Sequence, residues 1–263
     1  MNCPVCGHVN AVGSRFCSSC GTRLQELPVG EGERKLVSVL FADVAGSTEM
    51  TQLLGAEGWA EVMNGAFSVM NEAVAAYGGT VGRLMGDGIL AFFGVPSAHE
   101  DDSERAVLAA LRIRDTAAEY GEGVLGRLGG QAGTARSFAV RVGVSTGQSV
   151  LTTVGDDVRA EFTAMGETAN LAARLQAMAE PGTVLIAQDT YDLVKHAFET
   201  VPLGARAVKG LAEPVKVYEV LDPIPGGAKR RGIEGLVAPL VGRERELREL
   251  RDRVARLGRG EGG

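Results

Sequence analysis

The sequence predicts an α/β sandwich with the split βαβ order of elements. Two observations support this fold class. Short apolar segments of strand length alternate with longer helical segments, in the order β-α-β-β-α-β followed by further strands. The 263 residues are 45% hydrophobic and 23% charged, which is ordinary globular composition and sufficient for a sizeable buried core.

The first half of this fold is predicted to contain a buried strand, a long helix, a β-hairpin and a second helix. The strand is a short run rich in Val and Leu. The long helix is interrupted by Gly55, Gly58 and Gly65 and ends at Gly78-Gly79. The turn Gly86-Asp87-Gly88 between two short apolar runs indicates the hairpin. These elements are expected at residues 35–42, 48–77, 80–85, 89–93 and 100–120.

The second half is predicted to begin with a glycine-rich, mobile loop at residues 121–137. This segment contains the pattern G-x-G-x-x-G, but it follows a helix rather than a strand, which disfavours a dinucleotide-binding fingerprint. The remaining elements are strands at residues 138–144, 149–154, 200–208 and 215–221, and a helix at residues 166–179.

The composition disfavours several classes of protein. Lys and Arg total 27 and Asp and Glu total 33, so the formal net charge of −6 argues against a general nucleic-acid or membrane-surface binder. No run of 18 apolar residues exists, and the N-terminus lacks the basic and apolar regions of a secretory signal. We therefore expect a cytoplasmic protein without a membrane span.

All four cysteines lie within the first 20 residues. Cys3, Cys6, Cys17 and Cys20 form two C-x-x-C pairs, whose thiolates suit a closed, tetrahedral Zn²⁺ site. The segment contains few apolar residues, so the metal would supply its folding energy. The alternative is two local disulfides or redox pairs, which a cytosolic location disfavours. His8 is expected to be an exposed loop residue, because four cysteines already fill the zinc coordination shell.

Two aspartates lie where predicted strands end. Asp43 precedes Gly46-Ser47-Thr48 and the start of a helix, whose backbone N–H groups are suited to phosphate oxygens. Asp87 lies at the tip of the hairpin. A carboxylate at such a position is costly unless it is paired or metal-bound, and two of them suit two Mg²⁺ ions for in-line displacement at phosphorus. The alternatives are a helix cap for Asp43 and an ordinary turn residue for Asp87.

Asn170 and Arg174 are four residues apart, so they share one face of the predicted helix at residues 166–179. The guanidinium group suits a charged phosphoryl group, and the amide suits an orienting contact. The alternative is an exposed polar pair on an amphipathic helix.

Several ordered motifs together resemble the catalytic domain of class III adenylyl and guanylyl cyclases, over about residues 34–222. The resemblance implies a ferredoxin-like split βαβ cyclase domain that acts as a homodimer with two sites across the interface. The motifs are LFADVAGST (40–48), GG (78–79), GDGILAFFG (86–94), RVGVSTG (141–147), GETANLAAR (166–174) and VKGLAEPV (208–215).

The resemblance implies the conversion of ATP to cyclic AMP and pyrophosphate, by attack of the ribose 3′-hydroxyl on the α-phosphorus. Two Mg²⁺ or Mn²⁺ ions would bind at the metal residues of one subunit. Asn170 and Arg174 of the partner would orient the ribose and stabilise the transition state, and Lys209 of the partner would reach the terminal phosphates. The implied metal residues are Asp43, Val44 and Asp87, and the implied substrate-binding residues are Gly46, Ser47, Thr48, Arg83, Thr163 and Lys209.

Two of these residues bear on the choice of purine. Adenylyl cyclases of this family often have a Lys three residues before the Gly-Asp pair, with an Asp or Thr opposite, and here the positions hold Arg83 and Thr163. The Thr163 hydroxyl is able to accept from the adenine amine, whereas Arg83 keeps the charge on a bulkier, planar group. Guanylyl cyclases typically use Glu and Cys at these positions, so the sequence favours ATP.

The two ends of the chain carry weaker resemblances. Residues 1–26 resemble small zinc ribbons of bacterial cyclases, and residues 27–33 read as a linker. In residues 223–263, which include a charged amphipathic helix at 242–257, the stretch PLVGRERE (239–246) resembles the start of an AAA-like or STAND-type ATPase domain. We therefore expect the front part of a longer cyclase–ATPase regulator.

Two functional alternatives stay open. The cyclase domain could be a catalytically weak or inactive nucleotide-sensing module that regulates a downstream ATPase domain, and Arg83 is the feature in its favour. The ribbon could bind nucleic acid, but Phe16 is its one aromatic residue, which leaves a thin surface for stacking.

We expect each chain to carry about one zinc ion. Cys6→Ser and Cys17→Ser should each lose the ion, because three thiolates leave the coordination shell open. His8→Ala should retain it as the matched control. Elemental analysis and zinc release to a chromogenic chelator measure the content, and zinc loss in His8→Ala would contradict the four-cysteine site.

Overall fold

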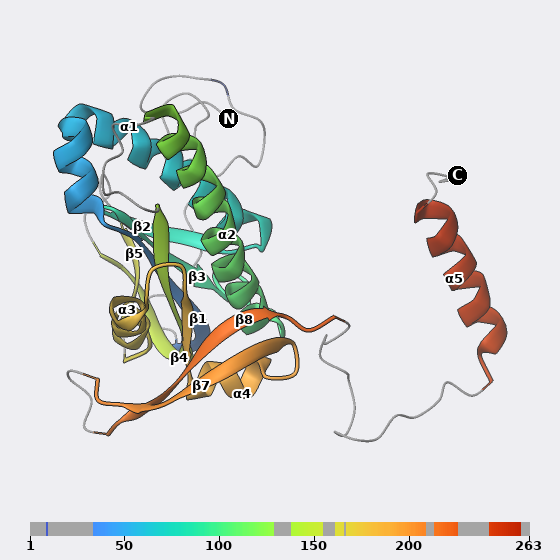
Figure 1. Ribbon diagram of the computed structural model, residues 1–263. Helices are drawn as coiled ribbons and strands as arrows, with labels where there is room; N and C mark the ends of the chain where they lie inside the picture. The colour runs from blue at the N-terminus through green and yellow to red at the C-terminus, as the bar shows by residue number, and fades with distance from the viewer. Residues whose placement is uncertain are drawn as a thin grey trace. The chain divides into compact units, whose positions relative to one another are not determined.

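The computed structural model describes residue 9 and residues 34–128, 138–154, 161–165, 167–208, 213–225 and 242–258 (Figure 1). The chain divides into two compact units, Met1–Gly227 and Ala228–Gly263. The elements are β1 (Arg34–Ala45), α1 (Ser47–Ala76), β2 (Thr80–Met85), β3 (Gly88–Phe93), α2 (Asp102–Leu128), β4 (Ala139–Val154), β5 (Glu161–Met165), α3 (Glu167–Met178), β6 (Val184–Ala187), α4 (Gln188–Val194), β7 (Phe198–Arg206), β8 (Val215–Pro223) and α5 (Glu244–Gly258).

The described strands of the first unit form one sheet in the order β2-β3-β1-β4-β6-β8-β7, with β5 paired to β4 outside this row. The central strand β1 pairs antiparallel with β3 on one side and with β4 on the other. The pairing of β4 with β6 is parallel, and the other pairings are antiparallel.

Helices cover both faces of the sheet, which gives the predicted α/β sandwich (Figure 1). Alternate residues of β1 point to opposite faces, as the two-residue period of a strand requires. Leu40, Ala42 and Val44 pack with residues of α1, α2 and α4, whereas Val37 and Val39 pack with Ala172 of α3 on the opposite face. α3 therefore lies alone among the described helices on the second face.

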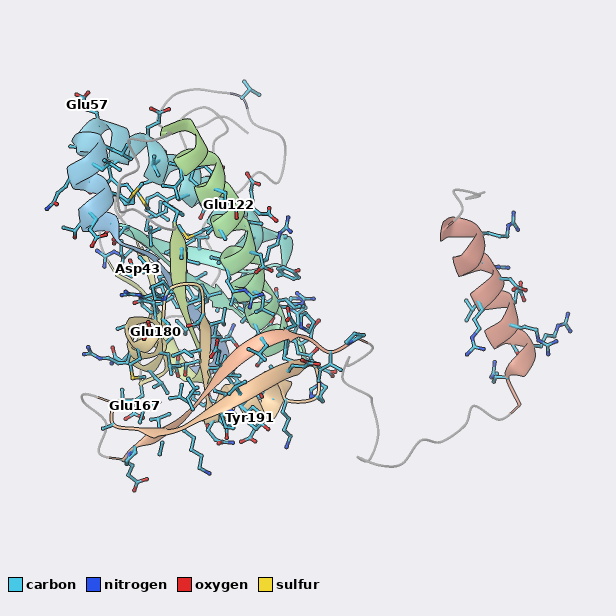
Figure 2. All side chains as sticks on the ribbon, viewed as in Figure 1. Asp43, Glu57, Glu122, Glu167, Glu180 and Tyr191 are labelled. Atoms are coloured by element: carbon cyan, nitrogen blue, oxygen red, sulfur yellow. The ribbon has the colours of Figure 1, made fainter. Side chains whose placement is uncertain are left out.

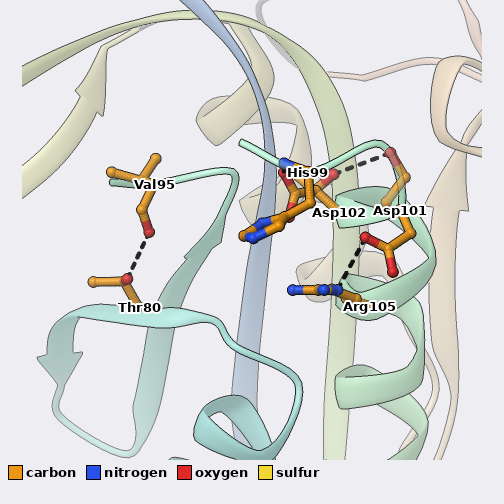
Figure 3. A network of polar contacts seen from close by, with 8 residues as sticks. Thr80, Val95, His99, Asp101, Asp102 and Arg105 are labelled. Carbon is orange, nitrogen blue, oxygen red and sulfur yellow. Dashed lines mark hydrogen bonds and ion pairs between the residues drawn. The ribbon is translucent and has the colours of Figure 1, made fainter. Parts of the chain in front are cut away.

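A polar network holds the loop that leads from β3 into α2 (Figure 3). The buried carboxylate of Asp102 accepts from the backbone N–H of His99 at 2.6 Å. The Thr80 hydroxyl donates to the carbonyl oxygen of Val95 at 2.8 Å, which ties β2 to the same loop. These bonds anchor the start of α2 against the hairpin.

Most predicted elements are confirmed, with differences that long-range packing explains. The helix expected at residues 48–77 is present as α1, and of its three predicted interruptions the one at Gly55 is confirmed, with φ 71° and ψ 171°. The strands expected at 138–144 and 149–154 are one continuous strand, β4, because β1 pairs with it without a break. The elements β5, β6 and α4 were not predicted, since each is at most seven residues long.

The prediction of a mobile loop from residue 121 is wrong at its start, because α2 continues to Leu128. Gly121, Gly123 and Gly126 lie within this helix, so the G-x-G-x-x-G pattern does not form a phosphate-binding loop. At Gly121 an added Cβ would overlap the side chain of Phe138, so close packing rather than flexibility requires that glycine. Residues 129–137 lie outside the described residues.

The second unit contains α5, at the position where a charged helix was predicted. Arg253 donates to the Glu249 carboxylate at 2.7 Å across one turn, a spacing that supports an exposed helix. Among the described helices of both units, none combines the length and the apolar character needed to cross a membrane.

Two glycines of α2 provide a test of the helix end. Gly126 is exposed and an added Cβ would meet nothing, so Gly126→Ala should stabilise the helix by about 1 kcal/mol and raise Tm by about 2–4 °C. Gly121→Ala should instead destabilise the fold by about 1–3 kcal/mol through overpacking against Phe138. Thermal unfolding followed by circular dichroism measures both, and a neutral Gly126→Ala would indicate that α2 ends earlier.

Candidate functional site

Asp43 lies near the end of β1, between two neighbouring strands. It pairs with Gly88 of β3 on one side and with Arg141 of β4 on the other. Figure 2 labels Asp43 beside the start of α1. An added Cβ on Gly88 would come within 2.9 Å of the Asp43 Oδ1, so the bare glycine leaves room for the carboxyl group.

Asp87 lies in the turn of the β2–β3 hairpin, beside Asp43. Its backbone carbonyl accepts from the N–H of Val44 at 3.1 Å, which ties the hairpin tip to β1. The side chains of Asp43 and Asp87 are hydrogen-bonded to each other. The structure therefore brings together the two carboxylates that were predicted as metal ligands.

Burial, followed by the hydrogen bond to Asp87 and the negative charge of Asp87, raises the pKa of Asp43 from 3.8 to about 7. The positive charge of Arg141 opposes this shift. A protonated Asp43 is thus stabilised by donating to the Asp87 carboxylate. Two carboxyl groups that share a proton in this way offer the oxygen donor set that a divalent cation prefers.

The start of α1 lies directly after this pair of carboxylates. Gly46 is the N-cap residue with φ 78°, a conformation that favours glycine, and it has no side chain to accept from the first N–H groups of the helix. The helix-cap alternative for Asp43 is therefore wrong, and the N–H groups near Ser47 and Thr48 remain suited to an anion.

Arg141 belongs to the site but was not predicted as a site residue. It lies opposite Asp43 in the β1–β4 pairing, and its buried Nε has no hydrogen-bond partner among the described residues. A buried guanidinium N–H without a partner is costly, which indicates a group whose acceptor arrives with a ligand. An arginine within the apolar strand around residues 138–144 was the signal in the sequence.

Asn170 and Arg174 are exposed on α3, on the side of the helix turned away from the sheet. Thr168, Ala172 and Leu175 form the buried side of the same helix. The structure thus brings Asn170 and Arg174 to one helix face, as predicted, but shows no contact between them and the two aspartates within the described part of the chain.

The remaining predicted site residues are placed only in part. Arg83 is exposed on β2, and Thr163 lies on β5, paired with Thr152 of β4. β2 and β5 contact each other, so these two residues belong to neighbouring strands. Lys209 and the four cysteines Cys3, Cys6, Cys17 and Cys20 lie outside the described residues. In the described ranges, no cluster of three or more His, Cys, Asp or Glu residues suits a metal ion.

Comparison with known families gives two matches. Residues 29–222 match the family described as "Adenylate and Guanylate cyclase catalytic domain". Residues 2–24 match the zinc-ribbon domain family, which covers all four cysteines.

Comparison with individual proteins gives relatives in the same class. The structure is similar to the adenylyl cyclase CyaB from P. aeruginosa, with 32% identity and a TM-score of 0.66 over 77% of this chain and 99% of that chain. It is also similar to the guanylyl cyclase Cya2, with 26% identity and a TM-score of 0.63 over 73% and 94% of the two chains. Adenylate cyclase 1 of Rhizobium meliloti is 29% identical over 73% of this chain. The chain spans less than a third of the length of the first curated relatives it matches, between 22% and 29%.

The raised pKa of Asp43 predicts a pH-dependent stability of the metal-free protein. Because the folded-state pKa of about 7 exceeds the ordinary value of 3.8, the folded protein retains a proton that the unfolded chain releases. This contribution is fully present below pH 3.8 and is lost as the pH rises through about 7. Asp43→Asn, which stays neutral, should therefore have a Tm at pH 8 that exceeds that of the wild type by about 2–4 °C, the effect of about 1 kcal/mol.

Thermal unfolding in a chelator at pH 5 and pH 8 measures this difference, which should be small at pH 5. Mg²⁺ or Mn²⁺ should then raise the Tm of the wild type at pH 8 but not that of Asp43→Asn. Equal pH profiles of the two proteins would contradict the assignment.

Proposed function

The chain belongs to the adenylate and guanylate cyclase catalytic domain family, and on that premise we propose that it converts ATP to 3′,5′-cyclic AMP and pyrophosphate. The observation that carries this proposal is the hydrogen-bonded pair Asp43 and Asp87, which lies beside the start of α1 and beside Arg141, whose Nε has no hydrogen-bond partner among the described residues. The carboxylates suit the cations that accompany a nucleoside triphosphate. The N–H donors and the guanidinium group suit its phosphates.

The residues of this site have complementary roles. Asp43, Val44 and Asp87 would hold two divalent ions, Mg²⁺ or Mn²⁺, which would activate the ribose 3′-hydroxyl and neutralise phosphate charge. The N–H groups of Gly46, Ser47 and Thr48 donate to phosphate oxygens at the positive end of α1. Arg141 would add positive charge beside the phosphates, and Lys209 of the partner subunit would reach the terminal phosphates of the leaving pyrophosphate.

Each site is proposed to be completed by a second copy of the chain. Asn170 and Arg174 of the partner subunit would orient the ribose and stabilise the charge that develops at the α-phosphorus. Their exposure on α3, without a contact to the aspartates of the same chain, supports a role across a homodimer interface. Such a dimer contains two sites, each with metal residues from one chain and α3 residues from the other.

ATP is the proposed substrate because of the residues at the purine positions. The solved relatives include an adenylyl and a guanylyl cyclase, so family membership leaves the purine open. Thr163 provides a hydroxyl acceptor for the adenine amine, and Arg83 on the neighbouring strand β2 provides a donor. Neither position carries the Glu or Cys expected for guanine.

The second candidate is a nucleotide-sensing module with little or no turnover. The observation in its favour is Arg83, which replaces the expected Lys and is exposed on β2. Under both candidates, we propose a zinc ribbon in residues 1–26, a linker in residues 27–33 and the cyclase domain in residues 34–222. Residues 223–263 would lead into an ATPase domain, and the helix α5 lies in that segment.

The direct test is cyclic AMP formation from ATP with Mg²⁺ or Mn²⁺, measured by mass spectrometry on a preparation shown to be dimeric. Asp43→Ala and Arg174→Ala should each lower kcat by about 10²–10³-fold, because each removes a group that stabilises the transition state. Asp189→Ala, which removes an exposed carboxylate on α4, is the matched control and should retain full activity.

The other outcomes separate the candidates. Cyclic GMP formation from GTP in preference to the ATP reaction would contradict the purine assignment. Absence of product from both nucleotides, together with saturable binding of ATP by the dimer, would favour the sensing module.

A further inference from the structure

α3 lies unusually close to β4. The two glycines of β4 beneath this helix, Gly143 and Gly147, leave no room for a side chain. A Cβ on Gly143 would overlap two backbone atoms of α3, the carbonyl oxygen of Ala172 and the nitrogen of Gln176, and would lie 2.9 Å from the Cβ of Leu175. The sheet therefore touches the backbone of the helix at Gly143.

The surrounding contacts prevent α3 from sliding along the sheet to make room for a side chain at Gly143. Ala172 and Leu175 are fully buried and belong to different clusters, Ala172 with Val37 and Val39 and Leu175 with Leu185. Gly143 itself pairs with β1 on one side and with β6 on the other, so its backbone is held from both sides. A side chain at Gly143 must therefore move α3 away from the sheet.

Movement of α3 would carry the proposed transition-state residues with it. Asn170 and Arg174 lie two residues before and two residues after Ala172, on the exposed side of the same helix. Because a helix is stiff over three turns, the distance between α3 and β4 determines how far both side chains project from the sheet.

We propose that Gly143 is a positioning residue for the cyclase reaction, which sets the height of α3 above the sheet and thereby places Asn170 and Arg174 in the site completed with a second copy of the chain. This inference rests on the function proposed above. Gly143 touches no substrate in this role, and its contribution is the absence of a side chain beneath the helix backbone. Ordinary contact distances require a shift of about 1 Å for an added Cβ, and a misplacement of that size costs about 10²-fold in rate.

The first experiment is steady-state kinetics of the full chain with Gly143→Ala. We expect kcat to fall by about 10²-fold with little change in KM for Mg·ATP, because the interaction lost is made in the transition state. Gly126→Ala is the control, because an added Cβ on this exposed glycine of α2 would meet nothing within 4 Å, and it should retain the wild-type kcat.

Gly147→Ala is a graded second variant on the same strand and beneath the same helix. An added Cβ there would lie 2.6 Å from the Thr168 hydroxyl, the end of a side chain that is able to rotate, rather than against helix backbone. Its kcat should fall by about 10-fold or less. If Gly143→Ala does not fold, Gly147→Ala replaces it in the experiments.

A heterodimer experiment distinguishes positioning from general damage. Chains with different affinity tags are co-expressed and the mixed dimers are purified. Gly143→Ala paired with Asp43→Ala should regain about half of the wild-type activity, because one site then combines an intact pair of aspartates with an intact α3. Gly143→Ala paired with Arg174→Ala should stay near the level of the Gly143→Ala homodimer, because both sites then lack a functional α3.

Each outcome decides the question. Wild-type kinetics in Gly143→Ala, or a mixed dimer with Asp43→Ala that regains no activity, would overturn the positioning role while the cyclase activity of the wild type stands. If Gly143→Ala does not fold and Gly147→Ala is used in its place, wild-type kinetics of Gly147→Ala, or no regained activity in its mixed dimer with Asp43→Ala, would overturn the positioning role. A wild-type protein without cyclase activity would instead overturn the proposed function, and the positioning role with it.

Discussion

The antiparallel pairing of β1 with β4 holds the groups of the site in place. Residues 34–45 of β1 pair with residues 150–139 of β4 without a break, so the register at one end determines the register at the other. This register places Arg141 beside Asp43 and presents Gly143 to α3. Beyond β1, the same strand β4 continues into the pairing with β5, which carries Thr163. A shift of one residue would turn each of these side chains to the other face of the sheet.

The electrostatics of the site follow from this arrangement. Burial disfavours the charged form of Asp43, and the hydrogen bond to Asp87 and the negative charge of that neighbouring carboxylate add to this, so the pKa of Asp43 rises to about 7. Arg141 offsets only part of that cost, and its own Nε has no acceptor within the described residues. The site thus combines carboxylates that suit cations with a guanidinium group that suits an anion. A ligand that brings both cations and phosphates would satisfy both kinds of group.

The two faces of the sheet have different roles. α1, α2 and α4 bury the larger hydrophobic core on one face, which stabilises the domain. On the other face α3 packs against a smaller cluster that includes Val39 and Phe92, and its exposed side carries Asn170 and Arg174, which make no contact with the two aspartates within the described part of the chain. The two groups of residues are thus separate within one subunit, which is the physical reason for proposing that a second copy of the chain completes each site.

The sequence alone determined the α/β class, the hairpin around Asp87, the two aspartates and the shared helix face of Asn170 and Arg174, because local patterns of period 2 and 3.6 and turn residues encode these features. It did not determine the extension of α2 to Leu128, the continuity of β4 or the short elements β5, β6 and α4, since packing against distant segments decides them. The role of Arg141 and the close approach of α3 to Gly143 were decided only by the tertiary structure. Both depend on contacts between residues far apart in the sequence, across paired strands and between the sheet and α3. Local sequence patterns do not predict such contacts.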